Sequence, residues 1–181
     1  DVYLAGDSTN EYDFEKSFAV DNTFVSIVSV LIVLVVLLFT FQSVGMPLLL
    51  IVVIQGAIWL NFSFPYFSHT NLYFMGYLIV SSIQMGANID YAIVIGTRFS
   101  ELKDKMDHEQ AMIETINFAF PTILPSGTIM AVSGTLIGQM TSDACIVGIG
   151  QCLGRGTIIS IFLVLFVLPQ ILLVGSKIVD K

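Results

Sequence analysis

The sequence predicts an all-α fold: a polytopic membrane bundle of about five transmembrane helices. Two observations carry this prediction. Hydrophobic residues make up 55% of the 181 residues and charged residues only 12%, whereas soluble domains carry about 25% charged residues. Several apolar runs also reach the roughly 20 helical residues that cross a hydrocarbon core of about 30 Å. A soluble enzyme is therefore not expected, and the net charge of -7 gives no reason to expect a nucleic-acid partner.

The first three spans are separated by turns and charged segments. An uninterrupted apolar run predicts the first span at residues 24–42, and the turn SVGMP separates it from the second span at 47–64. The polar, proline-containing loop PYFSHTN follows. The aromatic segment LYFMGY is typical of the membrane interface. The third span is therefore predicted after it, at 78–97, and ends before the charged segment RFSELKDKMDHEQ.

The last two spans are predicted on either side of the short turn TSD. We expect residues 111–118 to form an amphipathic elbow along the membrane surface, and Pro125 to loosen the start of a fourth span at 120–139. The final apolar stretch is too long for one perpendicular span. Dividing it at the sequence GRG gives a fifth span at 156–176, preceded by an interfacial lead-in helix at 143–155.

Positive charges orient this predicted bundle in the cell membrane. Cytoplasmic segments carry an excess of Lys and Arg. The connection between the third and fourth spans and the C-terminus both have such residues, namely Arg98, Lys103, Lys105, Lys177 and Lys181. Five spans then place residues 1–22, which are rich in Asp and Glu, on the extracytoplasmic side.

One carboxylate stands near the middle of the predicted third span. An aspartate at a helix centre costs about 2.5–3.5 kcal/mol on insertion scales. Asp90 cannot reach the membrane surface, because the nearest end of the span is about seven residues, or roughly 10 Å, away. We therefore expect it to face the bundle or a water-filled cavity, where a carboxyl that gains and loses a proton suits a proton relay. The alternative is a structural aspartate that is hydrogen-bonded to a serine or an asparagine.

The residues beside Asp90 favour a neighbouring helix over lipid. Gly86 and Ala87, one turn earlier, are small and permit close helix approach. Tyr91 is rotated by about 100° from Asp90, so we expect its side chain to reach a different neighbour.

Other polar and small residues in the spans are interpreted mainly as packing devices. Ser126 and Ser133 share one face of the fourth span and are candidates to support the relay. Gly134 and Gly138 form a GxxxG motif, which brings helices close together. Arg155 is interpreted as a snorkelling interfacial residue, or as the partner of an acidic group in another domain. We expect Gln84 and Asn88 to form interhelical hydrogen bonds. We expect Cys145 and Cys152 to be packing residues and not metal ligands.

The segment GANIDYAIVIGTRFSE resembles the fourth span of each half of MMPL transporters, a branch of the RND superfamily. Their pattern is a GxxxDY helix that ends in an Arg-Tyr/Phe-x-Glu-Glu cytoplasmic step. This chain departs from it at Leu102 and matches it at Gly86, Asp90, Tyr91, Arg98, Phe99 and Glu101. PSGTIMAVSG resembles the fifth span of that family and LVLFVLPQILL the sixth, while YLAGDSTNEYDFEKSFAVDN resembles the last strand and exit of the porter domain.

The resemblance implies an architecture and a set of partners. Residues 1–22 would be the C-terminal end of an extracytoplasmic porter domain, and residues 23–181 would be spans two to six of a six-helix half. A complete transporter has two such halves, so the partners would be a second half, a porter domain, membrane lipids and a lipidic or amphiphilic substrate.

The resemblance also implies a mechanism. In the family, the Asp-Tyr pair of one half faces its counterpart in the other, and protonation there drives movement of the porter domain. Asp90 would be the proton acceptor, and Tyr91 its hydrogen-bonding partner across the pseudo-twofold axis. The protein would then be a secondary exporter driven by the proton-motive force, with protons as the coupling ion, no cofactor and no enzymatic activity.

Two other functions remain open from the sequence. A SecD/SecF-like protein-export component also carries an acid before a cytoplasmic arginine, but prefers Asp-Ala-Asn where this chain has Asp90, Tyr91 and Ala92. A sterol-sensing-type lipid receptor or scaffold would bind lipid without pumping, and would not need a titrating carboxylate.

Overall fold

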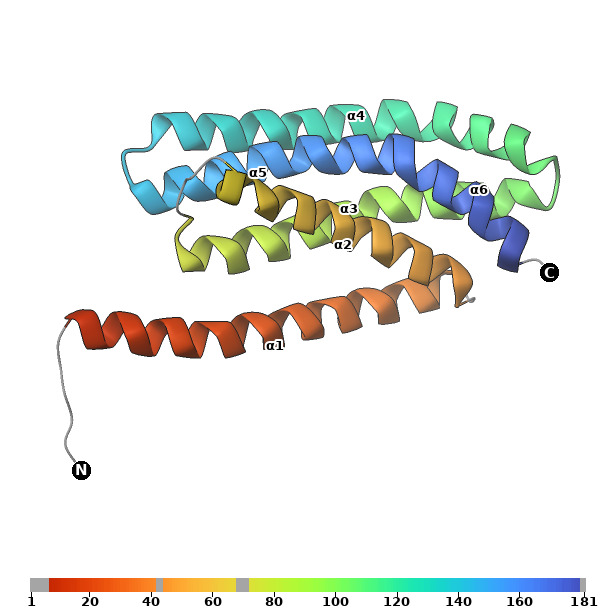
Figure 1. Cartoon of the computed structure of the whole chain (residues 1–181). Coiled ribbons are helices and arrows are strands. Elements are labelled where there is room, and N and C mark those ends of the chain that lie inside the picture. The colour runs from red at the N-terminus through yellow and green to blue at the C-terminus, as the bar shows by residue number, and fades with distance from the viewer. Residues whose placement is uncertain (1–6, 42–43, 68–71, 180–181) are drawn as a thin grey trace.

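The computed structural model describes residues 7–41, 44–67 and 72–179, almost all of them helical. In Figure 1 the helices form a bundle of roughly aligned rods, with the start of α1 and the end of α6 at opposite ends of the bundle. The elements in chain order are α1 (Asp7–Phe41), α2 (Gly45–Phe67), α3 (Phe74–Lys103), α4 (His108–Met140), α5 (Ala144–Phe162), the π-helical turn η1 (Leu163–Val167) and α6 (Leu168–Val179).

The prediction of five spans is confirmed, although the helices are longer than the sequence indicated. Apolar helices long enough to cross a membrane occupy Val20–Phe41, Gly45–Phe67, Met75–Lys103, His108–Met140 and Ala144–Gly175. The aromatic segment before the third span belongs to α3 from Phe74 onward. Two aspartates begin helices after short turns: Asp107 accepts a bond from the Glu109 backbone N–H, and Asp143 accepts from those of Cys145 and Ile146, as N-cap residues do.

Two predicted surface segments are instead parts of long spans. Residues 111–118, expected as an elbow, continue directly into the fourth span, and neither Pro121 nor Pro125 interrupts α4. Residues 143–155, expected as an interfacial lead-in, form the N-cap and the first part of α5, which packs along α4. Both predictions were wrong for one reason: each segment buries small or apolar residues against a neighbouring helix, and such tertiary packing outweighs local sequence signals.

The segment before the first span is described only from Asp7 onward. There the chain is helical without interruption to Phe41, and the strand and exit that the resemblance implies within residues 1–22 are not tested. Residues 1–6 lie outside the described part of the chain. The assignment of this segment to a porter domain stays a prediction.

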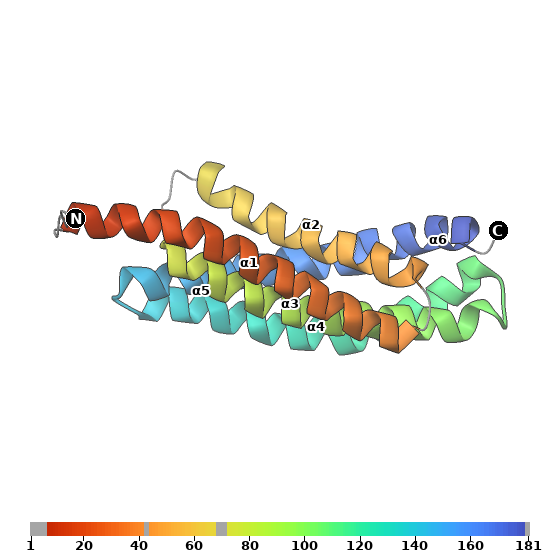
Figure 2. The ribbon, with the colours of Figure 1, turned by 90° about the horizontal axis from the view of Figure 1, so that it is seen from below.

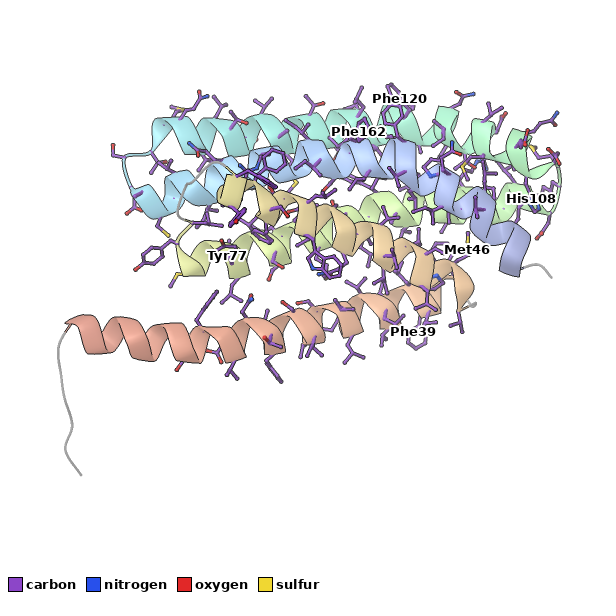
Figure 3. All side chains as sticks on the ribbon, viewed as in Figure 1. Phe39, Met46, Tyr77, His108, Phe120 and Phe162 are labelled. Atoms are coloured by element: carbon purple, nitrogen blue, oxygen red, sulfur yellow. The ribbon has the colours of Figure 1, made fainter. Side chains whose placement is uncertain are left out.

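Helix α1 is packed against the bundle mainly through its second half. Figure 1 shows its first half diverging from the other helices, and Figure 2 shows it crossing α3. Val33 and Leu37 are buried, and Phe41 packs against Gly96 of α3. In contrast, Phe39 is 81% exposed and points away from the bundle (Figure 3). Most of the apolar surface of α1 is therefore free to contact lipid or another part of the protein.

Helices α4 and α5 approach each other more closely than any side chain larger than hydrogen would allow. A Cβ atom at Gly134 would lie 2.6 Å from the backbone nitrogen of Gly154, and one at Gly138 would lie 3.0 Å from that of Gln151. A Cβ atom at Gly150 would lie 2.5 Å from the backbone nitrogen of Gly138. The GxxxG motifs of the two helices thus meet and allow backbone-to-backbone contact, which drives helix association in membranes.

The last span is a single rod with one π-helical turn. Its final segment contains Pro169, which has no N–H to donate and whose ring would clash with the carbonyl four residues earlier. Just before it, the Leu168 N–H bonds to the Leu163 carbonyl five residues back. This wider turn re-forms the hydrogen-bonding pattern next to the proline, so α5, η1 and α6 stay continuous from residue 144 to 179.

The close contact of α4 and α5 makes a direct prediction. Gly134→Ala should lower the midpoint of thermal unfolding in detergent, because overpacking of this kind costs about 1–3 kcal/mol. Gly56→Ala is the matched control, since a Cβ there meets no atom within 4 Å and alanine favours the helix by up to about 1 kcal/mol. Equal midpoints for the two variants would contradict the proposed contact.

Candidate functional site

Helix α3 carries the predicted Asp-Tyr pair and presents two distinct faces. Its buried side chains lie on one side of the helix; they are Val80, Gln84, Met85, Asn88, Tyr91, Ala92, Ile95, Phe99 and Leu102. A second stripe is exposed, and consists of Ile79, Ser82, Ile83, Gly86 and Asp90. The described helices therefore cover one side of α3 and leave the other side open.

Asp90 lies on the open stripe and is not covered by the described helices, so the expectation that it faces the bundle or a water-filled cavity stays a prediction. Its side chain is exposed and makes no hydrogen bond or ion pair with the described residues. The cause is the rotation of α3: burial of Gln84, Asn88 and Tyr91 turns Asp90 outward. The small neighbour Gly86 is equally open, with no atom within 4 Å of the position of a Cβ.

Tyr91 points the other way, into the helices of the same chain. The residue is 7% exposed and belongs to the hydrophobic core. Its hydroxyl oxygen lies 3.5 Å from the position that a Cβ on Gly127 of α4 would take, and Ile161 of α5 closes in on the same glycine. Tyr91 therefore connects α3 with α4 and α5, whereas Asp90 on the adjacent face does not.

The two serines proposed to support the relay lie on the exposed surface of α4. Ser126 and Ser133 are both exposed, whereas Gly127, Ala131 and Gly134 form the buried side of that helix. Neither hydroxyl bonds to Asp90 in the described part of the chain, so their supporting role stays a prediction.

The Arg-Phe-x-Glu step lies at the end of α3. Arg98 donates from Nη1 to Glu101 Oε2 at 3.1 Å, and its guanidinium carbon lies 5.1 Å from the centre of the Phe118 ring of α4. Phe99, the residue that follows Arg98, is fully buried. The ion pair is partly exposed and so contributes little stability by itself, but the ring contact ties the end of α3 to α4.

A buried polar network, missed by the sequence analysis, links α2, α3 and α5. Gln84 Nε2 donates to the Ser160 hydroxyl at 3.0 Å and to the Gly156 carbonyl at 3.2 Å. Asn61 Nδ2 donates to Gln84 Oε1 and to the Cys152 carbonyl, both at 3.0 Å. Asn61, Gln84 and Ser160 are almost completely inaccessible. Since buried amides without partners are costly, the network locks the three helices in one register.

Gly156 is required for this arrangement. A Cβ there would lie 2.8 Å from Gln84 Oε1 and would also overlap the amide nitrogen of Asn61. The GRG sequence, which was interpreted as the division between two helices, is therefore the place where two amide side chains approach the α5 backbone.

Arg155 belongs to the same network and is not only a snorkelling residue. Its Nε donates to Asn61 Oδ1 at 3.2 Å, and its Nη2 lies 3.3 Å from Cys152 Sγ. Its guanidinium carbon is 4.9 Å from the centre of the Phe64 ring, a cation–π distance. The sequence does carry one signal of this network: Asn61 and Gln84 lie within apolar spans, where such residues form hydrogen bonds between helices.

A small polar-lined cavity lies between α1, α2 and α3. Its volume is about 250 Å³, and it is lined by Asn22, Ser26, Gln55, Ile58, Trp59, Phe62, Tyr77 and Ser81. Figure 3 places Tyr77 near the first turns of α3. The side-chain oxygen of Gln55 is buried and has no partner among the described residues. The cavity thus presents hydrogen-bonding groups next to apolar side chains. Within the described ranges, no three His, Cys, Asp or Glu side chains gather closely enough to hold a metal ion.

Comparison with known proteins agrees with the arrangement of the spans. The MMPL family model matches residues 1–181, the whole chain. The chain belongs to the MMPL family. A relative is the Streptomyces coelicolor protein named "Putative membrane protein ActII-3", which is 24% identical over 181 residues, covering 97% of this chain. The chain spans about a quarter of the length of that relative. The MMPL assignment agrees with a multi-pass membrane protein of the RND superfamily.

The amide network predicts a difference between two buried residues of α3. Gln84→Met should lower the thermal unfolding midpoint, because it removes bonds to α2 and α5 worth about 1–2 kcal/mol in a membrane protein. Asn88→Leu should leave the midpoint unchanged or raise it, since the Asn88 amide nitrogen is buried without a partner in the described structure. A Gln84→Met protein as stable as wild type would show that the network does not hold the helices.

Proposed function

We propose that the chain is part of a proton-driven exporter in which Asp90 binds and releases the coupling proton. The observation that carries this proposal is the position of Asp90 within the third span, on a face that the described helices leave open. Membership of the MMPL family supports it, because the resemblance implies secondary transport rather than enzymatic catalysis.

The open face is the surface that we assign to the second half of the transporter. A charged aspartate against acyl chains costs about 2.5–3.5 kcal/mol, so the carboxyl must be protonated or covered in the complete protein. Ser82 and Gly86 extend this face as small residues, and small residues let another helix approach closely. In this arrangement Asp90 meets its counterpart, and the two carboxyls share protons between the halves.

Tyr91 provides the route from this interface into the chain. Its backbone is adjacent to Asp90, and its ring is packed among α3, α4 and α5 at Gly127 and Ile161. When Asp90 loses charge and its neighbours rearrange, a small rotation of α3 is transmitted through this ring to both helices. Tyr91 therefore couples protonation to movement from within the chain, and its buried side chain faces away from the surface that we assign to the second half.

The polar-lined cavity supports a lipidic or amphiphilic substrate. It lies among membrane spans and combines apolar walls with an unpartnered buried acceptor on Gln55. An amphiphile with a hydroxyl-bearing head would satisfy that oxygen while its apolar part stays among Ile58, Trp59 and Phe62. The same observation favours a second candidate function, a lipid receptor without pumping, and only the role of Asp90 separates the two.

The proposed orientation follows from the positions of the chain ends. Residue 7 and the α3–α4 loop lie at opposite ends of the bundle (Figure 1). With the basic α3–α4 loop in the cytoplasm, the N-terminal segment and any porter domain are extracytoplasmic, and the C-terminus is cytoplasmic.

The test is substitution of Asp90 in the full-length protein. Asp90→Asn should reduce proton-driven efflux of a fluorescent amphiphile from proteoliposomes to the background level, because an amide cannot exchange the coupling proton. Asp104→Asn, at an exposed position of the α3–α4 loop, is the matched control and should transport at the wild-type rate. Tyr91→Phe should give a partial loss.

The contradicting result is equally specific. Undiminished efflux by a folded Asp90→Asn protein would remove the relay role and favour the lipid receptor. Wild-type efflux by Tyr91→Phe would show that the hydroxyl is not needed, and would leave the ring contact and the assignment of Asp90 intact.

A further inference from the structure

The Arg155 guanidinium is held in a fixed position by neutral groups. Nε donates to Asn61 Oδ1, and Nη2 is directed to the Asn61 carbonyl at 3.5 Å and to Cys152 Sγ at 3.3 Å. The Phe64 ring covers one side of the group. Asn61 is itself fixed by its bond to Gln84. The cation is thus oriented before any ligand arrives, which lowers the cost of binding one.

No described carboxylate neutralises this charge. The ion pair found among the described residues joins Arg98 and Glu101, and Arg155 bonds only to amide, carbonyl and thiol groups. An arginine has five N–H donors, and the two on Nη1 of Arg155 have no acceptor within the described part of the chain. The buried polar atoms that lack a partner do not include Nη1 of Arg155. Since Nη1 has no acceptor among the described residues and is not buried, this edge of the guanidinium reaches the surface.

The surroundings of that edge are apolar, and Arg155 lies nearer to the α4–α5 end of the last span than to its other end. Arg155 lies twelve residues after the N-cap Asp143, or about 18 Å along the helix, and twenty residues before the end of the span at Gly175, or about 30 Å. The side chains one and two turns further along its face, Ile158 and Phe162, are 60% and 59% exposed. Such exposed apolar residues on a span suit contact with acyl chains, which would place lipid next to Arg155.

We propose that Arg155 binds the phosphate of a phospholipid in the leaflet at the α4–α5 turn. The open Nη1 edge donates to the phosphate oxygens, for which the guanidinium has matching geometry. The glycerol and acyl chains lie along Phe64, Ile158 and Phe162. A guanidinium within a membrane span is satisfied when the bilayer thins locally and a headgroup moves toward it, without an acidic side chain. This site is separate from Asp90 and does not depend on proton coupling.

The test measures lipid binding to the full-length protein, delipidated in detergent, by native mass spectrometry. Phosphatidylglycerol is the probe, and diacylglycerol with the same acyl chains is the control that lacks phosphate. Arg155→Gln should weaken binding of the tightest phosphatidylglycerol about tenfold and leave diacylglycerol binding unchanged. Lys105→Gln, at an exposed cation of the α3–α4 loop, should behave as wild type.

Every outcome decides the proposal. Phosphatidylglycerol binding by Arg155→Gln at wild-type affinity would overturn it, as would an equal loss in Lys105→Gln. If Arg155→Gln does not fold, Arg155→Lys carries the test: it keeps the charge but not the planar group, so binding should weaken severalfold, and unchanged binding would count against the site. Displacement of the bound lipid by inorganic phosphate would assign the site to a free anion and overturn the assignment to lipid.

Discussion

The buried bonds of Gln84 fix the rotation of α3, and the placement of the functional residues depends on that rotation. Gln84 bonds to Ser160 and Gly156 of α5 and accepts from Asn61 of α2. In a membrane these amides have no water to exchange with, so any rotation of α3 that breaks the network leaves polar groups unsatisfied. Because Tyr91 is about two turns away on the buried side, the same rotation places it in the core and Asp90 outside.

This arrangement divides α3 into a side that holds the chain together and a side that is available for another component. The held side joins α2, α4 and α5 through the amide network and Tyr91. The open side combines a carboxylate with small residues, which suits a protein neighbour better than lipid. Arg155 shows the opposite combination: a fixed cation among exposed apolar side chains, which suits a lipid headgroup. Asp90 and Arg155 thus indicate two kinds of neighbour.

The sequence predicted the features that depend on a single helix. Five spans follow from the length of apolar runs, and the special status of Asp90 follows from the cost of a charge in lipid. Features that depend on two helices were not predictable in the same way. The lead-in before Gly156 became part of a span because its glycines meet those of α4, and the partner of Arg155 is Asn61, 94 residues earlier. The outward position of Asp90 depends in turn on bonds made by Gln84.

The most direct test of the central claim asks what covers the open face of α3 in the full-length protein. A photo-crosslinking amino acid would replace Ser82 or Gly86 on that face, and Ile158 of α5 would serve as the comparison position on the surface assigned to lipid. Peptides linked to each position would be identified by mass spectrometry. We expect Ser82 and Gly86 to link to protein segments outside these 181 residues, and Ile158 to link to lipid. Lipid adducts alone at Ser82 and Gly86 would contradict the account, because Asp90 would then face acyl chains.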